Sequence, residues 1–374
     1  MLDLVAFRRA LHLAPEISGE EAATAAAVVA FTAETRPDRV LTGLGGHGIA
    51  LIYEGAAPGP AVMLRAELDA LPILDQGAVD WRSQVAGKGH LCGHDGHMAI
   101  LCGVAQALGA QRPARGRVVL LFQPAEEDGS GAAAVLADPR FAEIAPDWAF
   151  SLHNLPGVAL GAAVLCDGAA NCASVGMKIA LRGRTSHAAE PDLAISPARA
   201  IADLVPGLQA LRAGEALGPG FRLVTLTHLR MGEPVFGITP GAGAVYATLR
   251  CLQDSDMAAL KSEAVALAER LAARDGLALE ISWHDDFAAS VNAPEAAAHL
   301  RAALLAEGIS LAPARPMKAS EDFGRFGAVA PCAMVWIGAG VDHPPLHAPD
   351  YDFPEALIAP GIAVFRRILA DLLG

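Results

Sequence analysis

The sequence is poor in aromatic residues, in charged residues and, above all, in basic residues. Aromatics make up 5% and charged residues 18% of its 374 residues, against 53% hydrophobic residues. This balance excludes an intrinsically disordered chain and indicates well-packed aliphatic cores. The 28 lysines and arginines are outnumbered by 41 acidic residues, for a net charge of −13. Because phosphate binding needs a basic surface, we do not expect a nucleic-acid partner.

The sequence also lacks the patterns of a secreted or membrane protein. Its six cysteines are scattered, without the spacing of a disulfide framework. No run reaches the roughly 18 uninterrupted apolar residues of a membrane helix. Near the N-terminus an arginine pair follows the apolar residues, which is the wrong order for a signal peptide. We therefore expect a cytoplasmic protein with no membrane partner, in which a special cysteine is catalytic or metal-binding.

The first part of the chain has the pattern of an α/β domain. Residues 3–13 read as an amphipathic helix, and Ser18 with Glu21 has the spacing of a capping box for the next helix. Strands are predicted for the apolar runs at 49–54, 61–68, 117–123 and 148–154, with a helix at 98–108 before the third run. Near-continuous apolar strands separated by helices predict a largely buried sheet.

The pattern changes near residue 174. Residues 174–285 follow the order β-α-β-β-α-β, which is typical of a small ferredoxin-like α+β domain. The remainder resumes with helix, strand and helix. We therefore predict a discontinuous domain, residues 1–173 and 286–374, with an inserted domain at residues 174–285.

One glycine-rich motif is misleading. The segment GLGGHG at 43–48 has the spacing of a dinucleotide-binding fingerprint, but that fingerprint should open a helix. Here it precedes the strand at 49–54. We therefore predict a hairpin turn.

The adjacent carboxylates Glu126 and Glu127 follow the strand at 117–123. Two neighbouring side chains cannot point the same way, so one can bind a metal while the other transfers a proton. Further ligands are present: Cys92 and His94 lie in a glycine-punctuated loop, and His153 and His347 lie at a strand end and in a loop. Each alone has an ordinary structural explanation. As a set near the carboxyl ends of strands, they indicate a two-metal hydrolase.

Six motifs in order carry a family resemblance. They are RAELDALP (65–72), HLCGHDGHM (90–98), FQPAEE (122–127), GRTSHAAEP (183–191), SEDFG (320–324) and LHAPDYDF (346–353). The series resembles the amidohydrolase branch of the aminoacylase/carboxypeptidase metallopeptidase superfamily, which includes hippurate hydrolases, N-acyl-amino-acid deacetylases and auxin-conjugate hydrolases. The resemblance implies a di-metal peptidase-like catalytic domain with a mixed, mainly parallel sheet, and an inserted ferredoxin-like domain for dimerisation or as a lid.

The resemblance assigns roles at the reaction centre. It implies five metal ligands, namely Cys92, His94, Glu127, His153 and His347. Two divalent ions can share a water and lower its pKa, and Glu126 would act as the general base and then the general acid. The mixed ligands permit Mn or Zn, with Co or Ni as further options. Cys92 would bind as a thiolate, so metal affinity should fall at low pH.

Further residues are implied around this centre. Asp69 resembles the carboxylate that orients a ligating imidazole, and Asp95 is either a similar second-layer group or a helix cap. His187 would reach the active site of a neighbouring subunit, and Arg250 would bind the substrate carboxylate. Two departures bear on recognition: Gly237 stands where an Asn is usual, and Ser196 where an Asp is common. Glu67 stands where the branch commonly has Asp.

The sequence thus predicts a homodimeric or dimer-based metal-dependent amidohydrolase that releases an amino acid and a carboxylic acid from a small N-acyl (acetyl, aroyl or indole-acyl) amino acid. Three alternatives stay open: a dipeptidase or carboxypeptidase, a non-catalytic binding protein with the same fold, and an enzyme that uses Cys92 as a nucleophile with His94.

Overall fold

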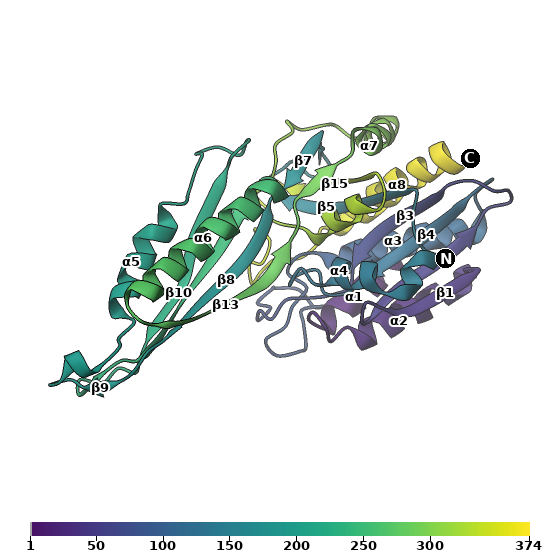
Figure 1. The fold of residues 1–374 in the computed structure, drawn as a ribbon. Coiled ribbons are helices and arrows are strands. Elements are labelled where there is room, and N and C mark those ends of the chain that lie inside the picture. Colours follow the sequence, from purple (N-terminus) through teal and green to yellow (C-terminus); the bar gives the residue numbers. More distant parts are fainter. Residues whose placement is uncertain (1) are drawn as a thin grey trace. The chain divides into compact units, whose positions relative to one another are not determined.

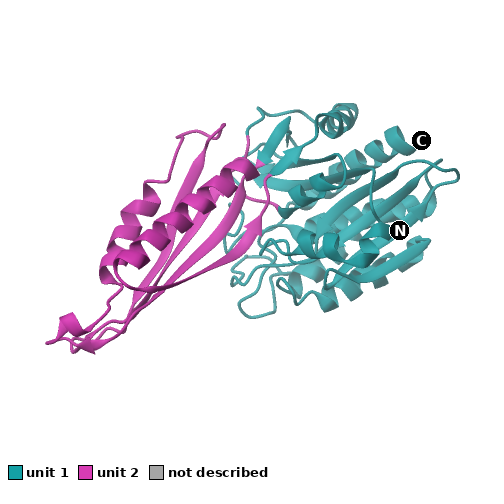
Figure 2. Cartoon of the chain, in the orientation of Figure 1, with its two compact units in different colours: residues 1–170, 290–315, 322–374 teal, residues 171–289, 316–321 magenta. Residues whose placement is uncertain are grey.

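The computed structural model describes residues 2–374, which form two compact units. Unit 1 contains residues 1–170, 290–315 and 322–374, and unit 2 contains residues 171–289 and 316–321 (Figure 2). These limits lie three to four residues from the predicted domain boundaries. Nothing in the sequence pattern indicated that residues 316–321 join unit 2. The assignment of a catalytic domain and a lid or dimerisation domain stays a prediction.

Unit 1 is built on a seven-stranded sheet in the order β1-β2-β4-β3-β5-β15-β6 (Figure 1). Its strands are β1 (Arg39–Leu44), β2 (Gly48–Glu54), β3 (Ala61–Glu67), β4 (Arg117–Gln123), β5 (Trp148–Pro156), β6 (Ala163–Val164) and β15 (Cys332–Gly340), while β7 (Gly168–Asn171) and β14 (Ser290–Asn292) form a separate pair. Strands β4, β3, β5 and β15 are parallel, and the outer pairs are antiparallel. The expected α/β fold with a mixed sheet is confirmed.

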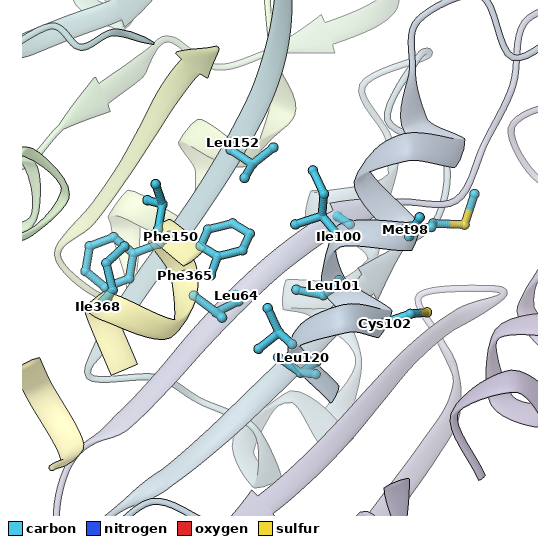
Figure 3. Close-up of a cluster of buried hydrophobic side chains, with 14 of the residues drawn as sticks. Leu64, Met98, Ile100, Leu101, Cys102, Leu120, Phe150, Leu152, Phe365 and Ile368 are labelled. Carbon is cyan, nitrogen blue, oxygen red and sulfur yellow. The ribbon is translucent and has the colours of Figure 1, made fainter. Parts of the chain in front are cut away.

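The core of unit 1 lies between this sheet and its long helices. The helices are α1 (Leu4–Leu13), α2 (Ala22–Thr32), α3 (His94–Ala110), α4 (Gly131–Ala137), α7 (Pro294–Ala306) and α8 (Ile358–Leu373), with 3-10 turns η1 (Ala33–Thr35), η2 (Pro139–Glu143), η4 (Asp322–Ala328) and η5 (Glu355–Leu357). Leu64 on β3, Leu120 on β4 and Phe150 on β5 belong to one buried cluster with Leu101 of α3 and Phe365 of α8 (Figure 3). Apolar packing of α3 against the sheet and α8 therefore fixes the helix that carries His94.

Two predictions about helix starts need correction. Helix α3 begins at His94, four residues before the predicted start, so His94 lies in its first turn. Ser18 and Glu21 do not form a capping box. The Ser18 hydroxyl donates to Asp69 Oδ2 at 2.7 Å, and Glu21 accepts from the Ala125 N–H at 2.8 Å. Both side chains are used in long-range bonds, which a local spacing rule cannot anticipate.

The glycine-rich segment at 43–48 is the predicted turn. It joins the antiparallel strands β1 and β2. Gly43, Gly45 and Gly46 have φ values of 71°, 58° and 121°, which favour glycine over other residues. A hairpin, and not a phosphate-binding helix start, therefore explains these glycines.

Unit 2 has a four-stranded antiparallel sheet in the order β10-β12-β8-β13. Its elements are β8 (Ala173–Arg182), β9 (Ser186–His187), η3 (Pro191–Leu193), α5 (Ala198–Gln209), β10 (Arg222–Met231), β11 (Ile238–Thr239), β12 (Ala242–Cys251), α6 (Asp254–Arg274) and β13 (Ala278–Phe287). Both helices pack on the sheet around one apolar cluster. This is the predicted ferredoxin-like strand order. The short strands β9 and β11 add a two-stranded ribbon.

Two expectations about the whole chain can be compared with the structure. All six cysteines are free and buried. In the part of the chain from residue 2 to residue 374, no helix combines the length and the apolar character needed to cross a membrane.

Leu101→Ala should destabilise unit 1 strongly. Leu101 is fully buried between the strands and α8, so alanine leaves a cavity that costs about 2–5 kcal/mol of unfolding free energy. Urea unfolding followed by circular dichroism measures this loss. Leu305→Ala on α7 is the control, because Leu305 is 60% exposed and its truncation should change stability by less than about 0.5 kcal/mol. Equal effects of the two substitutions would contradict the packing described.

Candidate metal centre

The carboxyl ends of the central parallel strands bring the predicted reactive residues together. Strand β3 ends two residues before Asp69, and β4 ends three residues before Glu126. His153 lies on β5, near its carboxyl end. Because these neighbouring strands run in the same direction, their ends meet at one edge of the sheet. This edge is where α/β proteins commonly bind ligands.

The backbone just before the glutamate pair has an unusual conformation. Ala125 has a φ of 49°, which is uncommon for a residue other than glycine. Its N–H donates to Glu21 Oε1 at 2.8 Å, and its carbonyl accepts from the Gly131 N–H at 2.9 Å. The N–H of Glu127 donates to Asp69 Oδ2 at 2.9 Å. These bonds fix the turn from which Glu126 and Glu127 project.

All five predicted ligands and Glu126 lie in one cluster. Their ligand atoms fall within 4.8 Å of one another in three overlapping groups: Cys92, His94 and His153; Cys92, Glu127 and His347; and His94, Glu126 and Glu127. Cys92 Sγ is 3.5 Å from His153 Nε2, and His347 Nε2 is 3.5 Å from Glu127 Oε2. His94 Nε2 is 3.8 Å from Glu126 Oε2 and 3.9 Å from Glu127 Oε1. Cys92, His94 and Glu127 each belong to two of these groups. Shared ligands of this kind are expected where two cations bind next to each other.

The electrostatics of the cluster favour a cation. Burial opposes a charge on His94, but Asp69, Glu67 and Glu127 raise its pKa to about 10. The carboxylates therefore stabilise a proton here, and a divalent ion would be stabilised by the same negative potential. Burial and the nearby His97 and His94 hold the pKa of His153 well below its usual range. Burial and His94 also lower the pKa of His347, so the folded site favours the neutral form of both imidazoles, which is the form that binds a metal.

The donor set also fits a divalent metal. His94 Nε2 is buried and has no hydrogen-bond partner among residues 2–374. An imidazole nitrogen left in this way, beside carboxylates, a second buried imidazole and a thiol, matches the ligand types of Zn, Mn, Co or Ni. Burial together with Glu127 and Glu126 raises the pKa of the Cys92 thiol. A metal would have to displace that proton to gain the thiolate.

Asp69 and Asp95 support different parts of the structure around the proposed ligands. The backbone carbonyl of Asp69, not its carboxylate, lies 2.8 Å from His94 Nδ1, while Oδ1 lies 3.6 Å away, too far for a hydrogen bond. Asp95 pairs with Arg8 at 2.7 Å and with His12 Nδ1 at 2.8 Å. Asp69 thus orients His94 and the Glu127 backbone, whereas Asp95 ties the start of α3 to α1.

A second group of buried polar residues, without a definite role predicted from sequence, lies next to the proposed ligand His94. Glu67 pairs with Arg65 and lies 2.6 Å from His97 Nδ1. Arg65 also donates to Gln123 Oε1 at 2.9 Å. Glu67, His94 and His97 could themselves hold an ion, but the Arg65 guanidinium makes that position unfavourable for a cation. The sequence signal for this group was that its members lie within the same series of motifs as the ligands.

His187 and Arg250 do not lie together in unit 2. His187 is on β9, opposite Ile238 on the exposed ribbon, which lies at one tip of this unit (Figure 1). Arg250 lies at the other end of the sheet and donates to Lys318 O at 3.0 Å and to Ser320 Oγ at 2.9 Å. Strand β12 runs eight residues from Ala242 to Arg250, a span of about 26 Å. One small molecule cannot contact both side chains of the same unit.

The two sequence departures also lie in unit 2. Gly237 accepts a hydrogen bond from the Ala188 N–H at 3.1 Å within the ribbon. A Cβ added to Gly237 would meet no atom within 4 Å. Ser196 Oγ accepts from the Ala198 N–H at 3.3 Å at the start of α5. The space around Gly237 therefore does not require a glycine at this position.

Comparison with known proteins gives consistent matches along the chain. The family described as Peptidase family M20/M25/M40 matches residues 63–371. An N-acetyl-L-cysteine deacetylase of Bacillus subtilis is 29% identical over 95% of this chain and 84% of its own length. An N-acetyldiaminopimelate deacetylase of Streptococcus suis is 30% identical over 93% of each chain. A dinuclear metal-binding M20 peptidase of B. subtilis is 26% identical, covering 99% of this chain and 97% of its own, with a TM-score of 0.82.

Asp69→Asn should weaken metal binding. The substitution removes the carboxylate that accepts from Ser18 and from the Glu127 N–H, so the ligand frame loosens. We expect metal affinity to fall about 10- to 100-fold, measured by competition with a chromophoric chelator. Asp38→Asn is the control, because its carboxylate accepts from the Glu54 N–H on the surface. Unchanged affinity in Asp69→Asn would show that Asp69 does not support the ligands.

Proposed function

Because the chain belongs to peptidase family M20/M25/M40, we propose that it is a metal-dependent amidohydrolase that cleaves the amide bond of a small N-acyl amino acid. The products are a carboxylic acid and a free amino acid. Two named relatives support this substrate class, because one acts on N-acetyl-L-cysteine and another on N-acetyldiaminopimelate. The matched structure of a dinuclear metal-binding relative supports a pair of divalent ions.

The observation that carries the proposal is the arrangement around Glu126. Glu126 is 5% exposed and its carboxylate lies beside a set of side chains with metal-ligand chemistry. A buried carboxylate next to such a set can exchange a proton with a reacting group while the ligands stay in place. Cys92, His94, Glu127, His153 and His347 would hold the ions. When bound, two divalent ions would supply Lewis-acid polarisation of the amide carbonyl and lower the pKa of a water.

The two adjacent glutamates then have different tasks. Glu126 accepts the proton of the attacking water and returns it to the leaving nitrogen. Glu127 lies toward His347 and its N–H is fixed by Asp69, so it serves as a ligand. Both carboxylates nevertheless lie near His94 Nε2, at 3.8 Å for Glu126 and 3.9 Å for Glu127. Burial of the cluster limits competing proton exchange with bulk water.

Mn or Zn is proposed as the native metal ion, and Co or Ni is proposed to be able to replace it. A homodimer or dimer-based oligomer in the cytoplasm is proposed, in which His187 of one subunit serves the site of its neighbour. The separation of His187 and Arg250 within unit 2 supports this arrangement. Arg250 would then recognise the substrate carboxylate.

Two alternative reactions are less well supported. A peptidase would need a group that recognises a free α-amino terminus or a longer chain. The fold is also shared with a tripeptidase of Staphylococcus aureus, but that chain is only 14% identical and its likeness concerns the fold alone. A Cys92 nucleophile would need a stable thiolate, whereas burial and the two glutamates raise the pKa of this thiol. The imidazole nitrogen 3.5 Å from Cys92 Sγ also belongs to His153, and not to the His94 that a Cys92–His94 pair would use.

Glu126→Gln should abolish most hydrolysis and keep the metals. The substitution removes the proton-accepting carboxylate without changing a proposed ligand, so kcat should fall about 100- to 10,000-fold. A mass-spectrometric panel of N-acetyl and N-aroyl amino acids, with added Mn²⁺ or Zn²⁺, measures turnover. Metal content is determined on the same samples. Glu127→Gln is the comparison, because it should lose metal as well as activity.

Two results would contradict this proposal. One is the absence of hydrolysis across the panel by the metal-loaded wild type, which would favour a binding protein. The other is faster turnover of a dipeptide than of its N-acetyl analogue, which would favour a dipeptidase. Activity that resists EDTA and is lost on thiol alkylation would support the cysteine mechanism instead.

Gly237→Asn should improve binding of simple N-acyl amino acids. The position has space for a side chain, so the variant should fold normally and restore an amide that can donate to the substrate. A hydrogen bond to a charged substrate group would lower KM about tenfold, with kcat nearly unchanged. Gly218→Asn is the control, because that glycine also has nothing within 4 Å of an added Cβ. Equal KM values in wild type and both variants would exclude Gly237 from recognition.

A further inference from the structure

A buried chain of hydrogen bonds links four side chains that are not proposed ligands. Glu67 Oε2 lies 2.6 Å from His97 Nδ1, and His97 Nε2 lies 2.7 Å from Asn154 Oδ1. Asn154 Nδ2 donates to the Tyr351 hydroxyl at 2.5 Å. Each of the four residues is at most 2% exposed. We call this set, Glu67, His97, Asn154 and Tyr351, the relay.

Three members of the relay lie next to proposed ligands along the chain. His97 is three residues after His94 on α3, so both lie on one face of the helix, with ring centroids 5.7 Å apart. Asn154 directly follows His153. Tyr351 is four residues after His347. The relay therefore joins a helix start, a strand end and a loop, each of which carries one imidazole of the centre.

Of the three segments that carry a proposed imidazole ligand, the loop with His347 depends most on support from buried hydrogen bonds. His347 has a φ of 68°, which is unfavourable for a residue other than glycine, and its side chain is 48% exposed. Its N–H donates to Leu91 O at 2.8 Å, which fixes the backbone at one point. Tyr351 is fully buried, and its N–H donates to Ala348 O at 3.0 Å. The turn between His347 and Tyr351 is thus held from the buried side.

We propose that Tyr351 is a positioning residue for the metal centre, acting through Asn154 and His97 to hold the loop of His347 in register with His153 and His94. The inference rests on the proposed function only in that it assigns metal binding to this centre. The Tyr351 hydroxyl accepts from Asn154, which is not a proposed ligand. Its effect should therefore appear in ion binding and coordination geometry, and not only in stability.

Tyr351→Phe tests the proposal, with Tyr53→Phe as a matched control. Both substitutions remove one hydroxyl and keep the ring. Tyr53 lies on β2, is fully buried, and its hydroxyl is 2.6 Å from Thr35 Oγ1, so it also loses one buried hydrogen bond. Affinity for Mn²⁺ and Zn²⁺ is measured by chelator competition, and the Co²⁺-substituted proteins are compared by visible absorption. Urea midpoints report stability.

We expect Tyr351→Phe to weaken metal binding about 10- to 100-fold and to change the Co²⁺ spectrum. Tyr53→Phe should lower the urea midpoint while its metal affinity and Co²⁺ spectrum match the wild type. Asn154→Leu should reproduce the defect of Tyr351→Phe. The double variant Asn154→Leu with Tyr351→Phe should be no worse than the stronger single variant, because both interrupt the same path.

Wild-type metal affinity and an unchanged Co²⁺ spectrum in Tyr351→Phe would overturn the proposal. Additive losses in the double variant would also overturn it, because the two residues would then act separately. These outcomes are independent of the substrate. The proposed function fails if the metal-loaded wild type does not hydrolyse the acyl-amino-acid panel, whereas the relay fails on ion binding alone.

Discussion

Buried negative charge at the carboxyl edge of the parallel strands is the constraint that shapes unit 1. Glu67, Asp69, Glu126 and Glu127 meet there, and each needs a partner because an isolated buried carboxylate is costly. Glu67 has Arg65 and His97, and Asp69 accepts from Ser18 and the Glu127 N–H. The residual negative potential raises the pKa of His94. A divalent cation that displaces this proton would balance the same potential and bind His94 Nε2, which has no hydrogen-bond partner among residues 2–374.

The rest of unit 1 keeps these groups from relaxing away from one another. Asp322 accepts from Arg65 on β3, from Gln123 on β4 and from the Ala132 N–H of α4. Arg8 of α1 pairs with Asp95 in the first turn of α3. These buried charges therefore bond β3 to β4 and α4, and α1 to α3, which restrains the strand ends and helix starts relative to one another. Such a frame places ligands within the narrow tolerances that metal geometry requires.

The sequence was informative wherever local pattern and chemistry coincide. Apolar runs identified the central strands, and the ligand motifs marked residues that the folded chain does bring together. Hydrogen bonds between polar residues far apart in the chain could not be predicted from the sequence. Ser18 has the spacing of a helix cap, yet its hydroxyl donates to Asp69, 51 residues away in the chain. Asn154 and Tyr351 are ordinary residues next to ligands, and only the folded structure shows that they bond to each other. Whether a polar side chain bonds to a neighbour in sequence or to a distant residue depends on the folded structure, because folding decides which distant partners come close.

The residues proposed for catalysis and metal binding have a different structural environment from those proposed for substrate recognition. The proposed ligands and Glu126 lie at the edge of a buried sheet, where a changed side chain would disturb several bonded partners. His187 and Gly237 lie on the exposed ribbon of β9 and β11, and an added Cβ at Gly237 meets nothing within 4 Å. Substitutions on the ribbon therefore carry little structural cost. A change at position 237 in unit 2 therefore need not disturb the proposed ligands, which lie in unit 1.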